Sequence, residues 1–387
     1  MNLYKENEKL QIQTQSLLPV VEHLRKDIDP IDVHEIRLNE FVSVENVIPK
    51  REYYVLETFA GAGGLALGLE KAGLISVGAL EIDPHAAETL RKNRPEWNVI
   101  EGDIVDVADE GIKNYIDGKE IDILSGGYPC QAFSYAGERK GFADIRGTLL
   151  FPYSRILEEL NPKAFIAENV KGLVNHDNGK TLEATLKVFI NKGYTVYWNI
   201  LNAWDYDVAQ KRERIVIIGI RNDLVEKEKY SFKFPKAQKY KPVLKDVLEN
   251  VPKSLGQEYS DSKKKVMRLV PPGGSWINLP REVAKEYMGA SWYSGGGRRG
   301  MARRLSWEEP SLTLTTSPSQ KQTERCHPDE TRPFTTREYA RIQSFPDDWI
   351  FSGGMGAIYK QIGNAVPVNL AIYIGKSIIY YLNQFED

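Results

Sequence analysis

Several features that would place a protein in a special class are scarce in this chain of 387 residues. It has two cysteines, Cys130 and Cys326, which are too few for a disulfide framework or a cysteine-based metal cluster. No apolar run approaches the roughly 18 residues that a membrane span needs. The N-terminal stretch MNLYKENEK lacks the apolar core of a signal peptide. We therefore expect a cytoplasmic protein with no membrane partner and no metal.

The formal net charge is only −2, which by itself argues against a polyanionic partner. This average conceals an uneven distribution, because residues 226–345 contain 23 Lys and Arg but only 14 Asp and Glu. A basic segment joined to an acidic one is typical of a module that binds a polyanion. A solvated lysine run such as residues 263–265 explains part of this surplus, but less readily the whole of it.

Length and composition favour a soluble globular protein of two domains. Alternating strand and helix patterns fill residues 51–225 and return in an apolar C-terminal segment, residues 358–387. Between them, residues 226–357 are rich in Lys, Pro, Gly and aromatic residues, which predicts a smaller domain of mostly β and loop structure. Residues 1–50 form a polar N-terminal extension, with a short helical candidate at 17–24.

The first α/β unit indicates a nucleotide-binding, doubly wound fold. A β-rich strand starts at Tyr53, a glycine turn covers residues 60–64, and a helical run from Leu65 ends at Gly73. Glycines let the backbone approach a ligand closely. The turn reads Gly-x-Gly-Gly and lacks the Gly-x-Gly-x-x-Gly spacing of dinucleotide enzymes. A mononucleoside ligand such as S-adenosylmethionine therefore fits as well as a pyrophosphate.

Two acidic residues follow at the ends of the next strands. Glu81 ends a strand over residues 75–82, and its distance of 20 residues from Gly61 is typical of an acid that binds ribose hydroxyls. Asp103 follows a strand at residues 97–100 and could accept a hydrogen bond from an exocyclic amine such as that of adenine. Helix capping or solvation is the alternative for both.

Chemically reactive side chains are predicted at the same edge of the sheet. Cys130 follows a buried strand at residues 121–124 and the breaking pair Gly126-Gly127, where a thiolate could act as a nucleophile. A small buried apolar residue is the alternative. Glu168 ends the strand that begins at Ala164. Arg212 and Arg214 precede the most apolar strand, at residues 215–220, where a ligand contact is favoured over a solvated face. Helices are expected at residues 148–160, 181–192, 335–345 and 368–381, and a strand at 194–201.

The order of these motifs resembles the DNA (cytosine-5) methyltransferase family. It runs from the glycine turn and the acid 20 residues on, through Pro-Cys-Gln, Glu-Asn-Val and Gln-x-Arg-x-Arg, to a variable basic region and Gly-Asn-x-Val. The match covers residues 56–370. The resemblance implies a Rossmann-like, S-adenosylmethionine-dependent methyltransferase domain (51–225 plus 358–387) with a target-recognition domain (226–357), of the type found in prokaryotic restriction–modification systems.

The resemblance also implies a mechanism and a set of site residues. Cys130 would attack C6 of a cytosine flipped out of duplex DNA, Glu168 would contact N3, and Arg214 and Arg212 would offset the negative charge and bind the base carbonyl or a flanking phosphate. The implied cofactor contacts are Phe59, Gly61, Gly63, Gly64, Leu65, Glu81, Ile82, Asp103, Ile104, Pro129, Leu149, Asn364 and Val366. The predicted DNA contacts are Arg298, Arg299, Arg303, Arg304, Thr313 and Thr315, and Cys326 has no assigned role.

Double-stranded DNA is the expected partner, S-adenosylmethionine the methyl donor and S-adenosylhomocysteine the product. A monomer is expected, which shares its DNA site with a cognate restriction endonuclease without direct contact. A nicotinamide or flavin oxidoreductase shares the fold but gives Cys130, Glu168 and Arg214 no joint task. A tRNA-directed relative shares the chemistry, but its Cys-Phe-Thr element is absent from this sequence. An inactive DNA-binding relative would not need Cys130 and Glu168.

Overall fold

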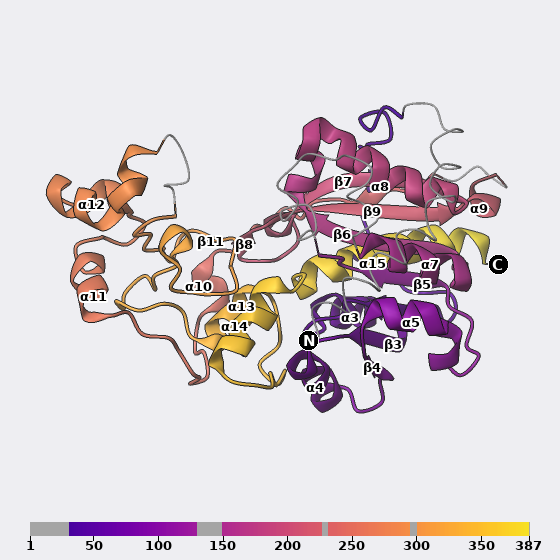
Figure 1. Cartoon of the computed structure of the whole chain (residues 1–387), viewed down its shortest axis with the longest axis horizontal. Coiled ribbons are helices and arrows are strands. Elements are labelled where there is room, and N and C mark those ends of the chain that lie inside the picture. Colours follow the sequence, from indigo (N-terminus) through magenta and orange to yellow (C-terminus); the bar gives the residue numbers. More distant parts are fainter. Residues whose placement is uncertain (1–30, 130–148, 227–230, 295–299, 387) are drawn as a thin grey trace, which may run out of the picture.

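The computed structural model describes residues 31–129, 149–226, 231–294 and 300–386. Cys130, Arg298, Arg299 and the helix expected at residues 17–24 lie outside the described residues. Figure 1 shows two parts along the longest axis, an α/β part that contains the C-terminus and a looser part that carries α11 and α12. Helices α13 and α14 lie where these two parts meet.

Among the described residues, seven strands form the central sheet in the order β4-β3-β2-β5-β6-β9-β7. The five strands from β4 to β6 pair in parallel, whereas β9 is antiparallel to both β6 and β7. The bounds are β2 (Tyr54–Thr58), β3 (Ile75–Glu81), β4 (Val99–Glu101), β5 (Ile123–Gly126), β6 (Ala164–Val170), β7 (Tyr194–Asn202) and β9 (Glu213–Arg221). The doubly wound sheet predicted from the sequence is confirmed.

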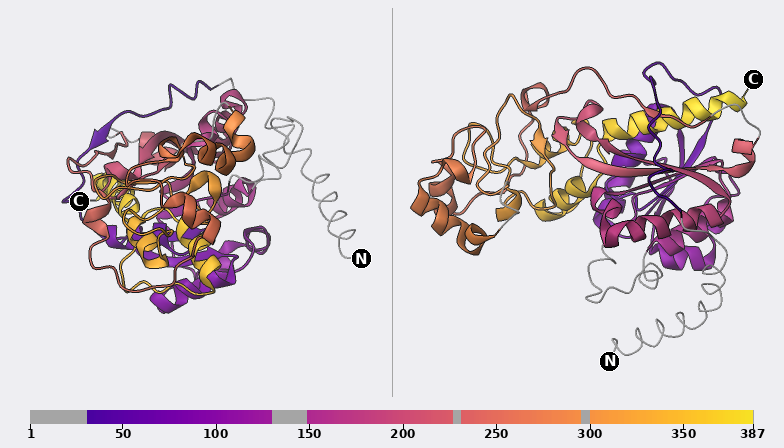
Figure 2. Two further views of the ribbon diagram at one scale, coloured as in Figure 1. Left: turned by 90° about the vertical axis from the view of Figure 1, so that its left-hand side faces the viewer. Right: turned by 90° about the horizontal axis from the view of Figure 1, so that it is seen from above.

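Helices cover both faces of this sheet because its strands are apolar on both sides. Alternate residues such as Leu56 and Leu124 face a core shared with α5 (Ile104–Glu110), α7 (Leu150–Leu160) and α8 (Lys180–Asn191). Their neighbours Val55 and Ile123 face the opposite core, which includes α3 (Gly64–Ala72) and α15 (Val368–Leu382). Figure 2 shows α15 in yellow on one side of the sheet and the magenta helices on the other. Helix α4 (Pro84–Asn93) follows β3.

Helix α15 packs against α3 through glycines that allow a very close approach. A Cβ atom added at Gly68 would lie 2.3 Å from Ala371 Cβ. The stretch Met355–Phe385 of the described chain is apolar enough to cross a membrane by length and composition, yet 72% of its most apolar window is buried inside the protein. Burial of this kind is typical of the core helix of a globular domain.

The segment that leads into the first long strand packs along the sheet edge formed by β7. Trp198 Nε1 donates to Val33 O at 2.7 Å, and Leu38 N donates to Trp198 O at 3.2 Å. Farther on, β1 (Phe41–Val42) pairs in parallel with β10 (Phe234–Pro235). Residues 31–50 thus cover an exposed strand edge, which would otherwise offer free backbone groups to another chain.

The secondary structure predicted for the smaller part requires one correction. Loops dominate residues 231–357 as expected, but the regular elements described there are mainly short helices, whereas its strands β10 and β11 (Ser311–Leu312) have two residues each. These helices are α10 (Leu244–Val247), α11 (Asp261–Met267), α12 (Arg281–Met288) and α13 (Thr336–Ile342). Side chains at helical spacing, such as Ala284 and Tyr287, pack in a separate small core, which explains the helices.

A further core joins the two parts. It brings Leu90 of α4 together with Leu314, Tyr339 of α13, Trp349 and Ile362 of α14 (Met355–Asn364). The end of the variable region is therefore packed on the α/β part and continues directly into α14 and α15. This arrangement fixes the position of residues 311–366 relative to the edge of the sheet.

Candidate active site

The glycine turn after β2 is held by the carboxylate at the end of β3. Glu81 Oε2 accepts a hydrogen bond from Gly61 N at 2.6 Å, and Oε1 accepts one from Asp83 N at 2.7 Å. Burial raises the pKa of Glu81, and these backbone N–H groups oppose the shift. Each carboxylate oxygen keeps a second acceptor position. Glu81 can therefore brace the turn and still bind a ribose hydroxyl.

Backbone strain and exposed apolar surface mark the same turn. Phe59 has a φ of 55°, and Gly61 and Gly63 have φ values of 55° and 82°. A left-handed conformation at a bulky residue such as Phe59 is uncommon and is often found at ligand sites. Next to Glu81, the side chain of Ile82 is 62% exposed. An aliphatic side chain there can pack against the face of an adenine ring.

Glu57, a further acidic residue near Glu81, was not predicted as a site residue from the sequence. It is buried near the end of β2, and Glu57 Oε2 has no hydrogen-bond partner among the described residues. Burial, followed by the negative charge of Glu81, raises its pKa well above the usual value. An acidic residue inside the otherwise uncharged strand Tyr54–Thr58 was the signal in the sequence. A buried polar atom without a partner fits a site that a polar ligand completes.

The other predicted cofactor residues come from several elements. Asp103 caps α5, since its Oδ1 accepts from Val105 N at 2.9 Å, so the capping alternative is realised. Val366 O lies beside Gly64, where an added Cβ would be 2.2 Å from this oxygen. Asn364 ends α14 and is exposed, and Leu149 directly precedes α7. Around the glycine turn, the acidic Glu81, the exposed apolar Ile82 and the backbone of the turn fit a nucleoside-containing ligand.

A largely buried ion pair lies at the ends of β6 and β9. Arg214 Nε is 2.9 Å from Glu168 Oε1, because antiparallel pairing brings Val170 opposite Arg214. Burial raises the pKa of Glu168, and the charges of Arg214 and Arg212 oppose that shift. A carboxyl group held between these opposing influences is suited to general acid–base catalysis.

The chain that leads to Cys130 passes close to this carboxylate. An added Cβ at Gly127 would lie 3.0 Å from Glu168 Oε2, and Asn169 Nδ2 donates to Tyr128 O at 2.9 Å. Glu168 and Asn169 are therefore in direct contact with the Gly127-Tyr128 segment. The predicted nucleophile Cys130 and the cofactor residue Pro129 follow this contact immediately in the sequence, although Cys130 itself lies outside the described residues.

Arg212 has a different surrounding from Arg214. Its Nη1 donates to Leu314 O at 3.1 Å and its Nη2 to Gly363 O at 2.9 Å, while Nε has no partner in the part of the chain that the structure describes. Burial lowers the pKa of Arg212 to about 9, helped by Arg214 and opposed by Glu168. The guanidinium therefore joins two backbone segments.

The predicted DNA-contacting residues that the structure describes do not form one surface, and Arg304 requires a correction. Its side chain is buried and donates from Nε to Val270 O at 2.8 Å, from Nη2 to Met267 O at 2.8 Å and from Nη1 to His327 O at 3.1 Å. A guanidinium used in this way organises the small core and does not reach a phosphate. Consecutive residues of an extended chain point to opposite sides, so one of two adjacent arginines is directed inward.

The remaining predicted DNA contacts that the structure describes also bind to groups within the chain. Arg303 Nη2 pairs with Glu309 Oε2 at 2.6 Å. Thr313 Oγ1 donates to Lys211 O at 2.9 Å, and Thr315 Oγ1 donates to Ser317 O at 3.0 Å. Both threonines follow β11, which pairs with β8 (Gln210–Lys211) directly ahead of Arg212. The Thr-Leu-Thr segment therefore lies between the variable region and the sheet edge.

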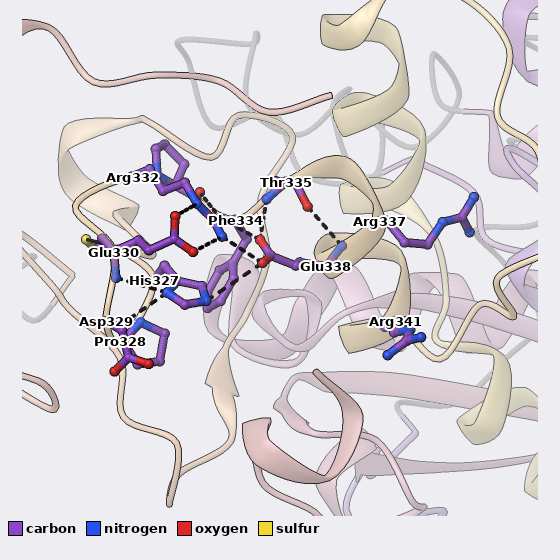
Figure 3. A network of polar contacts seen from close by, with 12 residues as sticks. His327, Pro328, Asp329, Glu330, Arg332, Phe334, Thr335, Arg337, Glu338 and Arg341 are labelled. Carbon is purple, nitrogen blue, oxygen red and sulfur yellow. Dashed lines mark hydrogen bonds and ion pairs between the residues drawn. The ribbon is translucent and has the colours of Figure 1, made fainter. Parts of the chain in front are cut away.

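A polar network, drawn in Figure 3, connects residues 327–332 to α13. Arg332 binds Glu338 through both carboxylate oxygens, at 2.7 and 2.9 Å, and Thr335 caps the helix. His327 Nδ1 accepts from Glu330 N, which directs Nε2 to Glu338, 3.7 Å away. Burial lowers the pKa of His327, and Glu338 opposes the shift. This network, which was not predicted from the sequence, stabilises the connection between the two parts.

Cys326, beside this network, is buried, and burial raises the pKa of its thiol. A thiol in this state is a poor nucleophile. Across the described residues, no group of three or more His, Cys, Asp or Glu side chains could hold a metal ion.

Comparison with known proteins identifies the family to which the chain belongs. A model of the C-5 cytosine-specific DNA methylase family matches residues 53–380, which include the glycine turn, the Glu168–Arg214 pair and the Thr-Leu-Thr segment. The chain belongs to this family. Members of this family depend on S-adenosylmethionine, which agrees with the turn, the acids and the exposed Ile82 around it.

Individual relatives extend the comparison. The methylase is 72% identical to the type II methyltransferase M.Sau96I of Staphylococcus aureus over 91% of this chain and 82% of that protein. It is 55% identical to M.Eco47II of Escherichia coli over 88% of this chain and 82% of the relative. Among solved structures, S. pombe Dnmt2 methyltransferase is similar in fold, with a TM-score of 0.60 and 19% identity over 87% of this chain and 100% of that one.

Proposed function

We propose that the methylase transfers a methyl group to C5 of a cytosine flipped out of a short, specific site in double-stranded DNA, through a covalent bond between Cys130 and C6. The observation that supports this best is the Glu168–Arg214 pair, 2.9 Å apart, beside the segment that leads to Cys130. Flipping is required because the reacting carbon of a stacked cytosine is out of reach of any side chain in the site.

Each residue of the site has a defined task in this mechanism. The Cys130 thiolate forms the bond to C6, and Glu168, with its raised pKa, shares a proton with N3, so that the ring electrons move toward C5. Arg214 keeps Glu168 oriented and limits the repulsion between its carboxylate and the thiolate. S-adenosylmethionine supplies an electrophilic methyl group on a sulfonium. Loss of H5 as a proton and release of the Cys130 sulfur restore the aromatic ring.

The methyl donor is proposed to lie against the glycine turn. Gly61 and Gly63 allow close approach, Glu81 can accept from the ribose, and Ile82 can cover the adenine. Glu57, whose Oε2 is buried without a partner among the described residues, lies behind the turn and can donate a hydrogen bond when it is protonated. Bound S-adenosylmethionine would supply the partners for these hydrogen-bonding groups.

The biological setting is proposed from the named relatives. Both M.Sau96I and M.Eco47II are type II methyltransferases, and together they cover most of the chain at high identity. We propose that the methylase likewise protects host DNA within a restriction–modification system. It would act as a monomer in the cytoplasm, on the same site as an endonuclease that it does not contact. Residues 51–225 plus 358–387 would form the catalytic domain and 226–357 the target-recognition domain.

The test is to express the chain in a host that lacks cytosine-5 methylation and to sequence its plasmid DNA after bisulfite treatment. We expect protected cytosines in a single short sequence context and none with an empty vector. The tRNA of the same cells is treated in parallel as the control for substrate class. Protected cytosines in tRNA but not in DNA, or in neither, would contradict the proposal.

A further inference from the structure

Two buried glutamines connect three segments that are far apart in the sequence. Gln210 Nε2 donates to Gln343 Oε1 at 2.7 Å, and Gln210 Oε1 accepts from Leu314 N at 3.0 Å. Both glutamine side chains are 0% exposed. Gln210 belongs to β8 next to Arg212, and Gln343 directly follows α13. The side-chain amide of Gln210 therefore links the Thr-Leu-Thr segment to Gln343 by hydrogen bonds.

Gln343 continues this chain of hydrogen bonds to the turn between α14 and α15. Its Nε2 donates to Ile362 O at 2.7 Å and to Ala365 O at 3.1 Å. The same turn carries Val366, whose carbonyl lies against Gly64 of the glycine turn. The path thus runs from Leu314 to the predicted cofactor pocket through side-chain amides.

Two contacts reinforce the path. Arg212 joins Leu314 O to Gly363 O, as described above. Gly363 itself is packed on the Thr-Leu-Thr segment, because an added Cβ would lie 2.5 Å from Thr315 O. The segment proposed to face DNA and the turn proposed to close the cofactor pocket are therefore in direct contact and are bonded to the same side chains.

Hydrogen bonds of this kind transmit displacement better than apolar packing does. An apolar contact tolerates sliding, whereas an amide–carbonyl bond weakens steeply when its distance or angle changes. Breaking one in a fully buried place also leaves an unsatisfied polar group, which is costly. A shift of Leu314 would therefore move Gln210, Gln343 and the turn at residues 362–366 together.

We propose that Gln210 and Gln343 are positioning residues that couple DNA binding at Thr313–Thr315 to the shape of the cofactor pocket at residues 364–366. This inference rests on the proposed function, since it requires both ligands to bind at these places. Binding of duplex DNA would order the turn and tighten cofactor binding, and by linkage the cofactor would tighten DNA binding by the same factor. Neither glutamine needs to contact either ligand.

The test is calorimetric titration of the full-length methylase with S-adenosylhomocysteine, with and without a short duplex that contains the site mapped by bisulfite sequencing. We expect the duplex to tighten binding about 5- to 150-fold in the unaltered protein. Gln343→Met, which keeps the side-chain length but removes the amide, should reduce this factor to near one. Binding of each ligand alone should stay close to its original strength.

Two further variants separate coupling from a general loss of stability. Gln343→Glu keeps an acceptor for Gln210 Nε2 but removes the two donors to the turn, so it should also lose the coupling. Gln361→Met is the matched control, because Gln361 is another buried glutamine of α14, with Nε2 bonded to Ser352 O at 2.8 Å, outside this path. The control should keep the full coupling factor.

The outcomes are distinct. Full coupling in Gln343→Met, or equal loss of coupling in Gln361→Met, would overturn the inference. So would an unaltered protein that binds both ligands independently of each other, although the proposed function would then stand. An unaltered protein that binds neither ligand would instead contradict the proposed function itself.

Discussion

Arg214 Nε and Glu168 Oε1 lie 2.9 Å apart, with side chains that are only 13% and 12% exposed. Glu168→Gln keeps the shape of this side chain but removes its charge and its titratable proton. We expect Glu168→Gln to lower the rate of methyl transfer by about 10²- to 10⁴-fold, the usual contribution of a general acid–base residue. The measurement is single-turnover transfer of a labelled methyl group, with S-adenosylhomocysteine binding as the control. A rate near that of the unaltered enzyme would mean that N3 obtains its proton from another group.

The same residue predicts a pH dependence. Burial raises the pKa of Glu168, so the folded enzyme keeps this proton to higher pH than an ordinary glutamate does. The single-turnover rate should then decrease as the pH rises through this raised pKa, because the proton donor to N3 is lost. The decrease should be absent in Glu168→Gln. If the rate of Glu168→Gln still decreased at high pH, the titrating group would be a different one.

Cys130 is predicted to be essential for chemistry but not for cofactor binding. Cys130→Ser should abolish methyl transfer, since a neutral hydroxyl is a far weaker nucleophile than a thiolate. A duplex that carries 5-fluorocytosine at the target should trap the covalent adduct on residue 130. The fluorine replaces H5 and, unlike hydrogen, cannot be removed by a base. Mass spectrometry of the digested adduct locates the bond. Normal turnover in Cys130→Ser, or an adduct on Cys326, would exclude this mechanism.

The sequence predicted the α/β part well because its signals are local. Strands such as Ile215–Ile220 are continuous apolar runs, and the glycine turn at residues 60–64 is flanked by a clear strand and a clear helix. The relation of Glu168 to Arg214 came from the family resemblance, because Arg214 begins its strand and only the antiparallel pairing of β9 brings it to the end of β6. These predictions depend on the chain within about ten residues, where periodicity and turn residues decide.

The variable region was predicted less well because its structure depends on distant partners. Arg304 is directed inward by carbonyls of Met267, Val270 and His327, which no local pattern reveals. The Gln210–Gln343 bond joins residues 133 positions apart. Glu57 was overlooked for a different reason, since an acid within a strand is usually solvated and only the assembled core removes it from water.

Gly64 is predicted to be irreplaceable where α3 meets the turn before α15. In Gly64→Ala the new Cβ would lie 2.2 Å from Val366 O, a backbone atom that cannot move alone. Overpacking of this kind costs about 1–3 kcal/mol of folding free energy, and it should also weaken S-adenosylhomocysteine binding. Thermal unfolding and calorimetry measure the two effects. Gly354→Ala, where an added Cβ meets nothing within 4 Å, is the control and should resemble the unaltered protein.

Arg304 is predicted to act in folding and not in phosphate binding. Arg304→Ala leaves several buried carbonyls without donors, at about 1–3 kcal/mol for each unsatisfied group, so a loss of at least about 3 kcal/mol in urea unfolding is expected. Arg281→Ala, on the exposed side of α12, is the control and should change stability by less than about 0.5 kcal/mol.

DNA binding distinguishes the two roles of Arg304 directly. A side chain that contacts a phosphate contributes about one unit to the slope of log affinity against log salt concentration. The folded fraction of Arg304→Ala should keep the slope of the unaltered methylase. A slope reduced by about one unit, together with unchanged stability, would restore Arg304 as a DNA contact.

Glu57 gives a pH dependence of stability whose sign is opposite to that of an ordinary paired carboxylate. Its pKa is raised well above 4.5 in the folded protein by burial and then by Glu81, so the folded state holds the proton more tightly than the unfolded chain. This contribution is fully present below the unfolded pKa and is lost as the pH rises through the folded one. Glu57→Gln cannot ionise, so it should match the unaltered protein at low pH and exceed its melting temperature at higher pH. Melting curves recorded across this pH range without cofactor compare the two proteins. A constant difference in melting temperature at every pH would show that Glu57 does not titrate in this range.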